Sequence, residues 1–179
     1  MTPTKTLLLV EDEGLVRHDL KEGLVEAGFD VSDVAQGGKA LSELEADPSR
    51  FNGLITDINL GRGPDGWDIA RRARELIPHL PVVYISGHGS TDWSSKGVPN
   101  SLTLGKPFAT AQLITAISTL LVEADAHKAR EGSNQHVVDA FDFELADLLG
   151  GLGDQRLERV VDDFEGARRG DPRSTPIIS

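Results

Sequence analysis

Cysteine is absent from this chain of 179 residues, which excludes a disulfide framework and any metal site built on thiolates. No apolar run approaches the roughly 20 residues that a membrane-spanning helix needs. The polar start is followed by an apolar run that is too short for a signal peptide. We therefore expect a cytoplasmic protein with no membrane partner.

Positive charge is scarce: 18 Lys and Arg stand against 29 Asp and Glu, for a net charge of −11. A nucleic-acid-binding domain normally presents a basic face, so we expect no nucleic-acid partner. Aromatic residues make up only 5% of the chain, yet the hydrophobic content of 39% is sufficient for a core. The composition favours a protein that binds other proteins.

Short apolar runs alternate with segments of helical periodicity over the first two thirds of the chain. This alternation predicts an α/β fold with a parallel sheet and helices on both faces. The stretch between Ser86 and Lys106 is rich in Gly, Ser and Pro, which predicts no regular helix there beyond a turn near Asp92 and Trp93. The expected strands are 6–10, 30–35, 53–56, 81–85 and 101–104, and the expected helices are 15–27, 38–46, 65–77 and 110–124.

The remaining residues differ in composition, so we predict one domain over 1–124 and an acidic tail over 125–179. Two stretches of the tail have helical spacing and are separated by the glycine-rich segment 150–153. We expect one or two short helices and a disordered end. The apolar positions are Val137, Phe141, Leu145 and Leu148, then Leu157, Val160, Val161 and Phe164.

Four of the expected strands end in polar side chains. Glu11 and Asp12 follow the first strand, and Asp57 ends the third. Ser86 ends the fourth strand, and Lys106 follows the fifth. The carboxyl ends of parallel strands meet in one crevice of an open sheet. Three carboxylates, one hydroxyl and one ammonium there suit a divalent cation and a phosphoryl group.

The arrangement over about residues 5–123 resembles the receiver domain of two-component response regulators. The resemblance implies a doubly wound, flavodoxin-like sheet of five strands in the order 2-1-3-4-5. It also implies that Asp57 is the phosphoacceptor, a nucleophile that forms an acyl phosphate. The motifs that carry it are Glu11-Asp12, Asp57, Ser86-Gly87 and Lys106-Pro107, in this order along the chain.

The resemblance assigns roles to the other site residues as well. Lys106 pairs with phosphoryl oxygens, and Ser86 hydrogen-bonds to the phosphoryl group. The bond before Pro107 is expected to be cis. Mg²⁺, which prefers oxygen ligands, is the implied cofactor. Its implied ligands are Glu11, Asp12, Asp57 and the backbone carbonyl of Asn59.

Three features depart from the family pattern. Thr103 occupies a position where receivers usually carry Tyr or Phe. The fourth helix is expected to be irregular. The loop after Asp57 is about one residue longer than usual, with Leu60-Gly61 in place of Met-Pro. His88 lies two residues after Ser86 and is a candidate for tuning dephosphorylation.

The resulting hypothesis is a stand-alone receiver that takes a phosphoryl group from a sensor histidine kinase or a phosphotransfer protein. Phosphorylation would change its binding to an unidentified downstream protein. It would not be an enzyme, apart from self-catalysed phosphoryl acceptance and slow autodephosphorylation. One alternative is a phosphorylation-independent scaffold, motivated by Thr103. Another is a phosphatase of the haloacid-dehalogenase type. Asn59 argues against it, because that motif needs an acid–base Asp two residues after the nucleophile.

Overall fold

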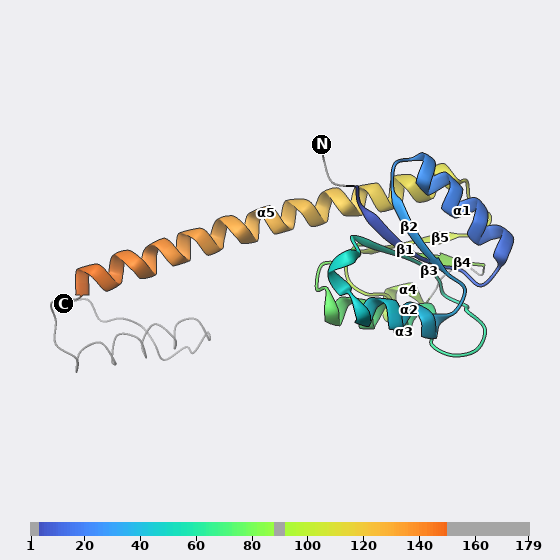
Figure 1. Cartoon of the computed structure of the whole chain (residues 1–179), viewed down its shortest axis with the longest axis horizontal. Helices are drawn as coiled ribbons and strands as arrows, with labels where there is room; N and C mark the ends of the chain where they lie inside the picture. The colour runs from blue at the N-terminus through green and yellow to red at the C-terminus, as the bar shows by residue number, and fades with distance from the viewer. Residues whose placement is uncertain (1–3, 88–91, 150–179) are drawn as a thin grey trace. The chain divides into compact units, whose positions relative to one another are not determined.

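The computed structural model describes residues 4–87 and 92–149. Contacts within the chain divide it into two compact units, 1–128 and 129–179. The first unit holds the strand–helix alternation (Figure 1). The predicted apolar stripe from Leu157 to Phe164, the glycine-rich segment 150–153 and His88 lie outside the described residues.

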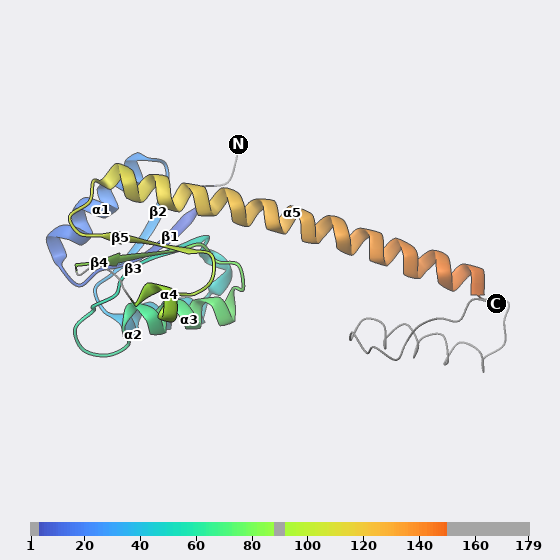
Figure 2. The same cartoon turned by 180° about the vertical axis from the view of Figure 1, so that it is seen from behind.

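Five parallel strands form one sheet in the order β2-β1-β3-β4-β5, which confirms the predicted topology (Figures 1 and 2). The three inner strands β1, β3 and β4 are almost wholly buried, as expected for continuous apolar runs covered on both faces. The edge strands β2 and β5 carry more polar and more exposed residues. The strands are β1 (Thr6–Val10), β2 (Asp30–Val34), β3 (Gly53–Asp57), β4 (Val82–Ser86) and β5 (Ser101–Gly105).

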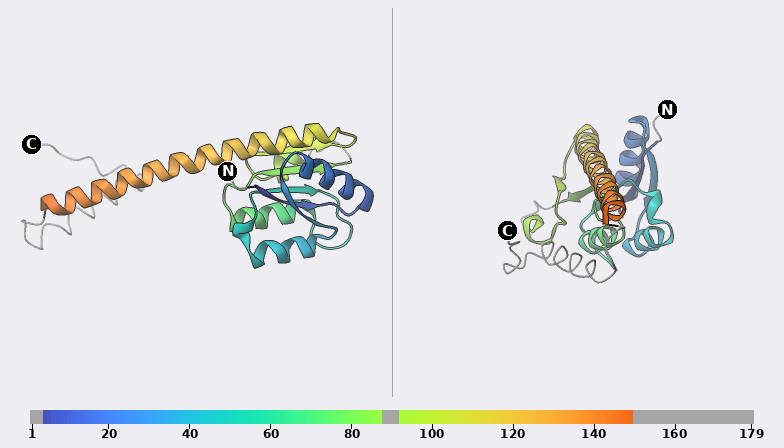
Figure 3. Two further views of the ribbon diagram at one scale, coloured as in Figure 1. Left: turned by 45° about the horizontal axis from the view of Figure 1, so that its top comes forward. Right: turned by 90° about the vertical axis from the view of Figure 1, so that its left-hand side faces the viewer.

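Helices cover both faces of the sheet (Figure 3). Helices α1 and α5 pack on one face, around Leu24, Ile55 and Ile117. Helices α2 and α3 pack on the other face, where Leu44 and Ile69 are fully buried. The helices are α1 (Gly14–Glu26), α2 (Gly37–Ala46), α3 (Gly66–Leu76), α4 (Trp93–Lys96) and α5 (Thr110–Leu149), with a 3-10 turn η1 (Pro48–Arg50) after α2.

Local sequence signals explain where several helices begin and end. Gly28, predicted to stop the first helix, has a φ of 94°, a conformation that residues with a side chain rarely adopt. Asp65 caps α3: its carboxylate accepts from the backbone N–H of Asp68 at 2.9 Å, and the Asp68 carboxylate accepts from the N–H of Asp65 at 3.3 Å. The start of α3 is therefore fixed directly after the loop that follows β3.

The fourth helix is short, as the sequence predicts. It comprises only Trp93–Lys96 and ends at Gly97, where an added side chain would come within 2.6 Å of the carbonyl oxygen of Trp93. The expected end of the last helix near Ala124 is wrong, because α5 continues to Leu149. Residues 125–131 contain Ala, Lys, Arg and Glu and no Pro, so local propensity favours continuation. No helix in the described part of the chain is long and apolar enough to cross a bilayer.

Candidate functional site

The predicted polar residues lie together at the carboxyl ends of the strands, called here the carboxyl edge of the sheet. β1 leads into Glu11 and Asp12, while β3 ends at Asp57 and β4 at Ser86. Lys106 follows β5, and its backbone N–H donates to the carbonyl oxygen of Ser86 at 2.7 Å. The structure therefore places on one edge side chains that are up to 95 residues apart in sequence.

Three carboxylates form an acidic cluster at this edge, defined here as Glu11, Asp12 and Asp57. One oxygen from each lies within 4.8 Å of the others. Glu11 is fully buried and Asp57 is 6% exposed, whereas Asp12 is exposed. Oxygen donors in this number suit Mg²⁺, which takes one or two protein carboxylates and keeps several waters. The donor set therefore fits the implied cofactor.

Lys106 is the cation of the site. Its Nζ donates to Oδ2 of Asp57 at 2.6 Å and to Oε2 of Glu11 at 2.8 Å. Burial alone would lower the pKa of Lys106, but the hydrogen bonds to Asp57 and Glu11 outweigh it and raise the pKa above its ordinary value. The ammonium therefore stays charged between the two carboxylates. The peptide bond between Lys106 and Pro107 is cis, which confirms the expectation from the sequence.

Glu11 is held by hydrogen bonds to its carboxylate and to its backbone carbonyl. Its Oε1 accepts from the N–H of Glu13 at 3.2 Å, and its backbone carbonyl accepts from Nη1 of Arg17 at 2.8 Å. Burial raises the pKa of Glu11, and the hydrogen bond from Lys106 opposes that shift only in part. The negative charge of Asp57 adds to the increase. The charged form of Glu11 is therefore less favourable than that of a carboxyl group in water, and a further cation would stabilise it.

Asp57 is oriented through both carboxylate oxygens. Oδ1 accepts from the N–H of Asn59 at 2.9 Å, while Oδ2 faces Lys106. Gly66, the first residue of α3, packs directly on the carbonyl oxygen of Asp57, so that no side chain fits there. The start of α3 and the loop before it therefore fix the position of the carboxylate.

The sequence did not reveal how the β4–β5 connection is held. Tyr84 of β4 is fully buried, and its hydroxyl oxygen accepts from the N–H of Val98 at 3.2 Å. Ser101 donates to the carbonyl oxygen of Val98 at 2.6 Å and accepts from the indole N–H of Trp93 at 3.1 Å. Thr103 pairs with Tyr84 in the sheet register. An aromatic ring is thus present beside Thr103, but on the neighbouring strand.

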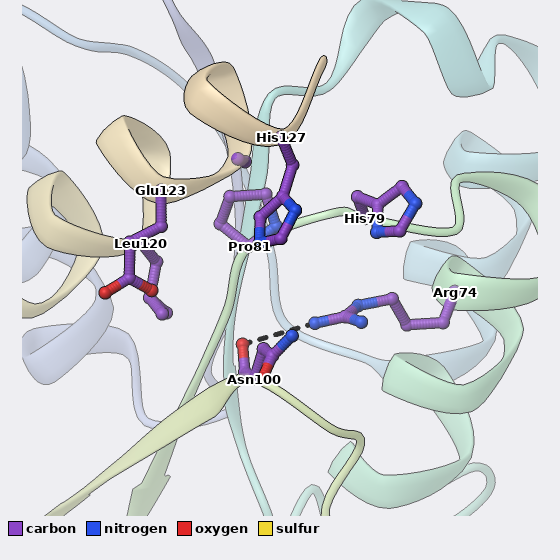
Figure 4. Close-up of a pocket in the computed structure, with 8 residues that line it drawn as sticks. Arg74, His79, Pro81, Asn100, Leu120, Glu123 and His127 are labelled. Carbon is purple, nitrogen blue, oxygen red and sulfur yellow. Dashed lines mark hydrogen bonds between the residues drawn. The ribbon is translucent and has the colours of Figure 1, made fainter. Parts of the chain in front are cut away.

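A small cavity of about 120 Å³ lies at the amino ends of β4 and β5, opposite the acidic cluster (Figure 4). The guanidinium of Arg74 reaches backbone carbonyl oxygens there, those of Leu80 and Pro99 at 2.7 Å, Pro78 at 3.2 Å and Asn100 at 3.3 Å. Burial lowers the pKa of Arg74. Its N–H groups bind the loops before β4 and β5, so Arg74 has a structural role. The sequence alone did not indicate this role.

Comparisons with known proteins agree with this geometry. The model of the response regulator receiver domain matches residues 7–118. The response regulator receiver protein CpdR of Brucella abortus is 33% identical over 122 residues, which cover 67% of this chain and 99% of CpdR. The transcriptional regulatory protein CusR of Escherichia coli is 34% identical over 157 residues, which cover 86% of this chain and 63% of CusR.

The solved structures include a response regulator receiver protein from Sinorhizobium medicae. It is 45% identical, with a TM-score of 0.66, and the match covers 69% of this chain and 99% of that one. The family model, the relatives and the solved structure all point to the domain that holds the acidic cluster. The chain therefore belongs to the response regulator receiver family, the signalling module of two-component phosphorelays.

Proposed function

We propose that Asp57 accepts the phosphoryl group in this receiver. The observation that carries the proposal is the contact of Asp57 Oδ2 with Lys106 Nζ at 2.6 Å inside the acidic cluster. A nucleophilic carboxylate beside a fixed cation at the end of a central strand is the arrangement that phosphoryl transfer needs. The rival phosphatase and scaffold functions are not favoured by the family match.

The proposed step is a displacement at phosphorus. A carboxylate oxygen of Asp57 forms the new O–P bond, while the P–N bond of a phosphohistidine on the donor protein breaks and the leaving imidazole takes up a proton. Lys106 binds a phosphoryl oxygen and stabilises the charge that moves onto it. The hydroxyl of Ser86, at the end of the neighbouring strand, hydrogen-bonds to another phosphoryl oxygen. The chain thereby accepts a group and does not turn over a substrate.

We assign Mg²⁺ to Glu11, Asp12, Asp57 and the backbone carbonyl of Asn59. Two of these carboxylates are buried, and three negative charges face the single positive charge of Lys106. A bound divalent cation would balance that excess and neutralise charge on the phosphoryl oxygens. This balance supports the assignment, since the two buried carboxylates share one cation and burying a net charge is costly.

The proposed donor is a sensor histidine kinase or a phosphotransfer protein. A segment of the sensor kinase CckA of Brucella abortus is 28% identical over 128 residues, which amount to 13% of that kinase. The acceptor of the signal would be a downstream protein that recognises the phosphorylated form. We assign the receiver to residues 1–124 and treat 125–179 as a separate acidic segment, supported by the boundary between compact units at Lys128.

Intact mass spectrometry after incubation with a small phosphodonor and Mg²⁺ tests the proposal. We expect one phosphoryl group per chain in the wild type, none in Asp57→Asn, and none in the wild type when Mg²⁺ is chelated. Asp19→Asn, which changes an exposed carboxylate of α1, is the matched control and should be modified like the wild type. Failure of the wild type both to form the adduct and to bind the phosphoryl mimic beryllofluoride would refute the proposal.

A further inference from the structure

The loop between β3 and α3 passes over the acidic cluster. At one end Gly61 has a φ of 68°, and a methyl group built on it would lie 3.8 Å from Oδ2 of Asp12. At the other end the carbonyl oxygen of Pro64 packs on Gly37 so closely that no side chain fits between them. The loop therefore lies near Asp12 at one end and packs tightly on α2 at the other, and Arg62 and Gly63, called here its apex, lie between these two points.

Arg62 is exposed and makes no hydrogen bond or ion pair with any residue in the described ranges. Other arginines of the domain behave differently, since Arg17, Arg71 and Arg72 each pair with a carboxylate. Its Cα is only ~3.8 Å from that of Gly61, the residue that approaches Asp12. A long cationic side chain without a partner in the described part of the chain therefore begins next to a group of carboxylates.

Charge explains why Arg62 would gain a partner only on phosphorylation. The three carboxylates and Lys106 leave two negative charges in excess, which one divalent cation balances. An acyl phosphate on Asp57 carries about two negative charges where the carboxylate carried one. Phosphorylation therefore creates one uncompensated negative charge beside the apex of the loop.

We propose that Arg62 binds the phosphoryl group on Asp57 and stabilises the phosphorylated state. The inference rests on the proposed function of Asp57. The planar guanidinium donates two parallel hydrogen bonds to phosphoryl oxygens, and the two flanking glycines give the loop freedom to deliver it. Arg62 lies between Gly61 and Gly63, which both have a positive φ, and it supplies the side chain at this point of the loop.

Titration calorimetry with beryllofluoride in the presence of Mg²⁺ tests this role on the full chain. We expect Arg62→Ala to bind the mimic about fivefold more weakly than the wild type, as for a partly solvated charge pair. Arg62→Lys keeps the positive charge but not the planar guanidinium, so its affinity for the mimic should lie between those of the wild type and Arg62→Ala. The matched control is Lys128→Ala, which also removes one exposed positive charge, at the last residue of the first unit. All variants should keep the melting temperature of the wild type.

The outcomes separate this inference from the proposed function. If the wild type binds beryllofluoride and Arg62→Ala binds it equally well, Arg62 has no such role and the function of Asp57 stands. The inference is likewise overturned if Arg62→Ala only slows transfer from a kinase, because the residue would then contact the donor protein. An equal loss in Lys128→Ala would indicate general electrostatics and would also overturn the inference. If the wild type does not bind the mimic, both proposals fall.

Discussion

Two ion clusters of opposite balance lie side by side in this domain. The acidic cluster has three carboxylates and one cation, Lys106, which contacts Glu11 and Asp57. In the second, called here the Asp33 cluster, one carboxylate is bound by two cations: Arg17 Nε at 3.2 Å and Lys21 Nζ at 2.6 Å. Arg17 connects the two, because it also donates to the backbone carbonyl of Glu11.

The contrast separates a ligand site from a structural contact. In the acidic cluster burial raises the pKa of Glu11, so a further cation would stabilise its charged form. In the Asp33 cluster the hydrogen bond from Lys21 outweighs burial and lowers the pKa of Asp33, so the charged form is already stabilised. Excess negative charge in a buried place indicates a site for a cation, whereas a part-exposed carboxylate already paired with cations indicates a contact that serves the fold.

Removing the single cation of the acidic cluster should have the largest effect. We expect Lys106→Ala to lower the free energy of unfolding by about 3 kcal/mol without Mg²⁺, because two buried carboxylates lose their partner. Saturating Mg²⁺ should restore much of this loss, since a ligand that binds only the folded state stabilises it. Urea unfolding with and without Mg²⁺ measures both quantities.

Lys21→Ala is the control for that experiment, because Asp33 keeps Arg17 as a partner. Its loss of stability should be smaller and should not depend on Mg²⁺. A similar Mg²⁺ rescue in both variants would show that the two clusters do not differ in the way described.

Arg74, a cation that binds backbone carbonyl oxygens, extends the comparison to the amino ends of the strands. We expect Arg74→Ala to lower the free energy of unfolding by about 2 kcal/mol, because the part-buried carbonyl oxygen of Leu80 and three exposed carbonyl oxygens lose a charged donor. Phosphoryl acceptance by Asp57 should not change. Arg71→Ala, on the same helix but paired with Asp68 on the surface, should cost much less in the same urea titration. An equal loss in the two variants would contradict the structural role of Arg74.

The Asp33 cluster should give the smallest effect and a defined pH dependence. A carboxyl group whose pKa is lowered on folding stabilises the fold above its ordinary pKa of 3.8, and this contribution is lost as the pH falls through the lowered value. We expect Asp33→Asn to cost about 1 kcal/mol at pH 7, because its partners are partly exposed. The difference from the wild type should vanish in acid. A difference that persists unchanged at pH 2 would have another cause than ionisation.

Much of the fold and the candidate site could be predicted because the signals are local. Apolar runs that end in a polar residue identify the inner strands, and a parallel sheet brings Glu11, Asp57 and Lys106 to one edge. The Gly, Ser and Pro content after Ser86 likewise predicts the short α4. The end of the last helix could not be predicted in this way, since a change in composition after Ala124 does not by itself end a helix.

Contacts with the backbone could not be predicted. Arg74 binds carbonyl oxygens, which every residue carries and no sequence pattern marks. The same holds for the hydroxyl of Tyr84 and the N–H of Val98. The position of Arg62 relative to the carboxylates also emerges only in three dimensions, because its neighbours in sequence do not show which carboxylates are already engaged.

The placement of the two tryptophans has a practical consequence. Trp67 is buried, with its ring 4.5 Å from that of Tyr84, whereas Trp93 is half-buried in the four-residue α4 and donates to Ser101. Replacing Trp67 with Phe leaves one indole in the whole chain, located in the β4–β5 connection. The emission spectrum of that variant reports on this connection alone. Rearrangements that begin at Ser86 can therefore be followed optically in solution, with no added label.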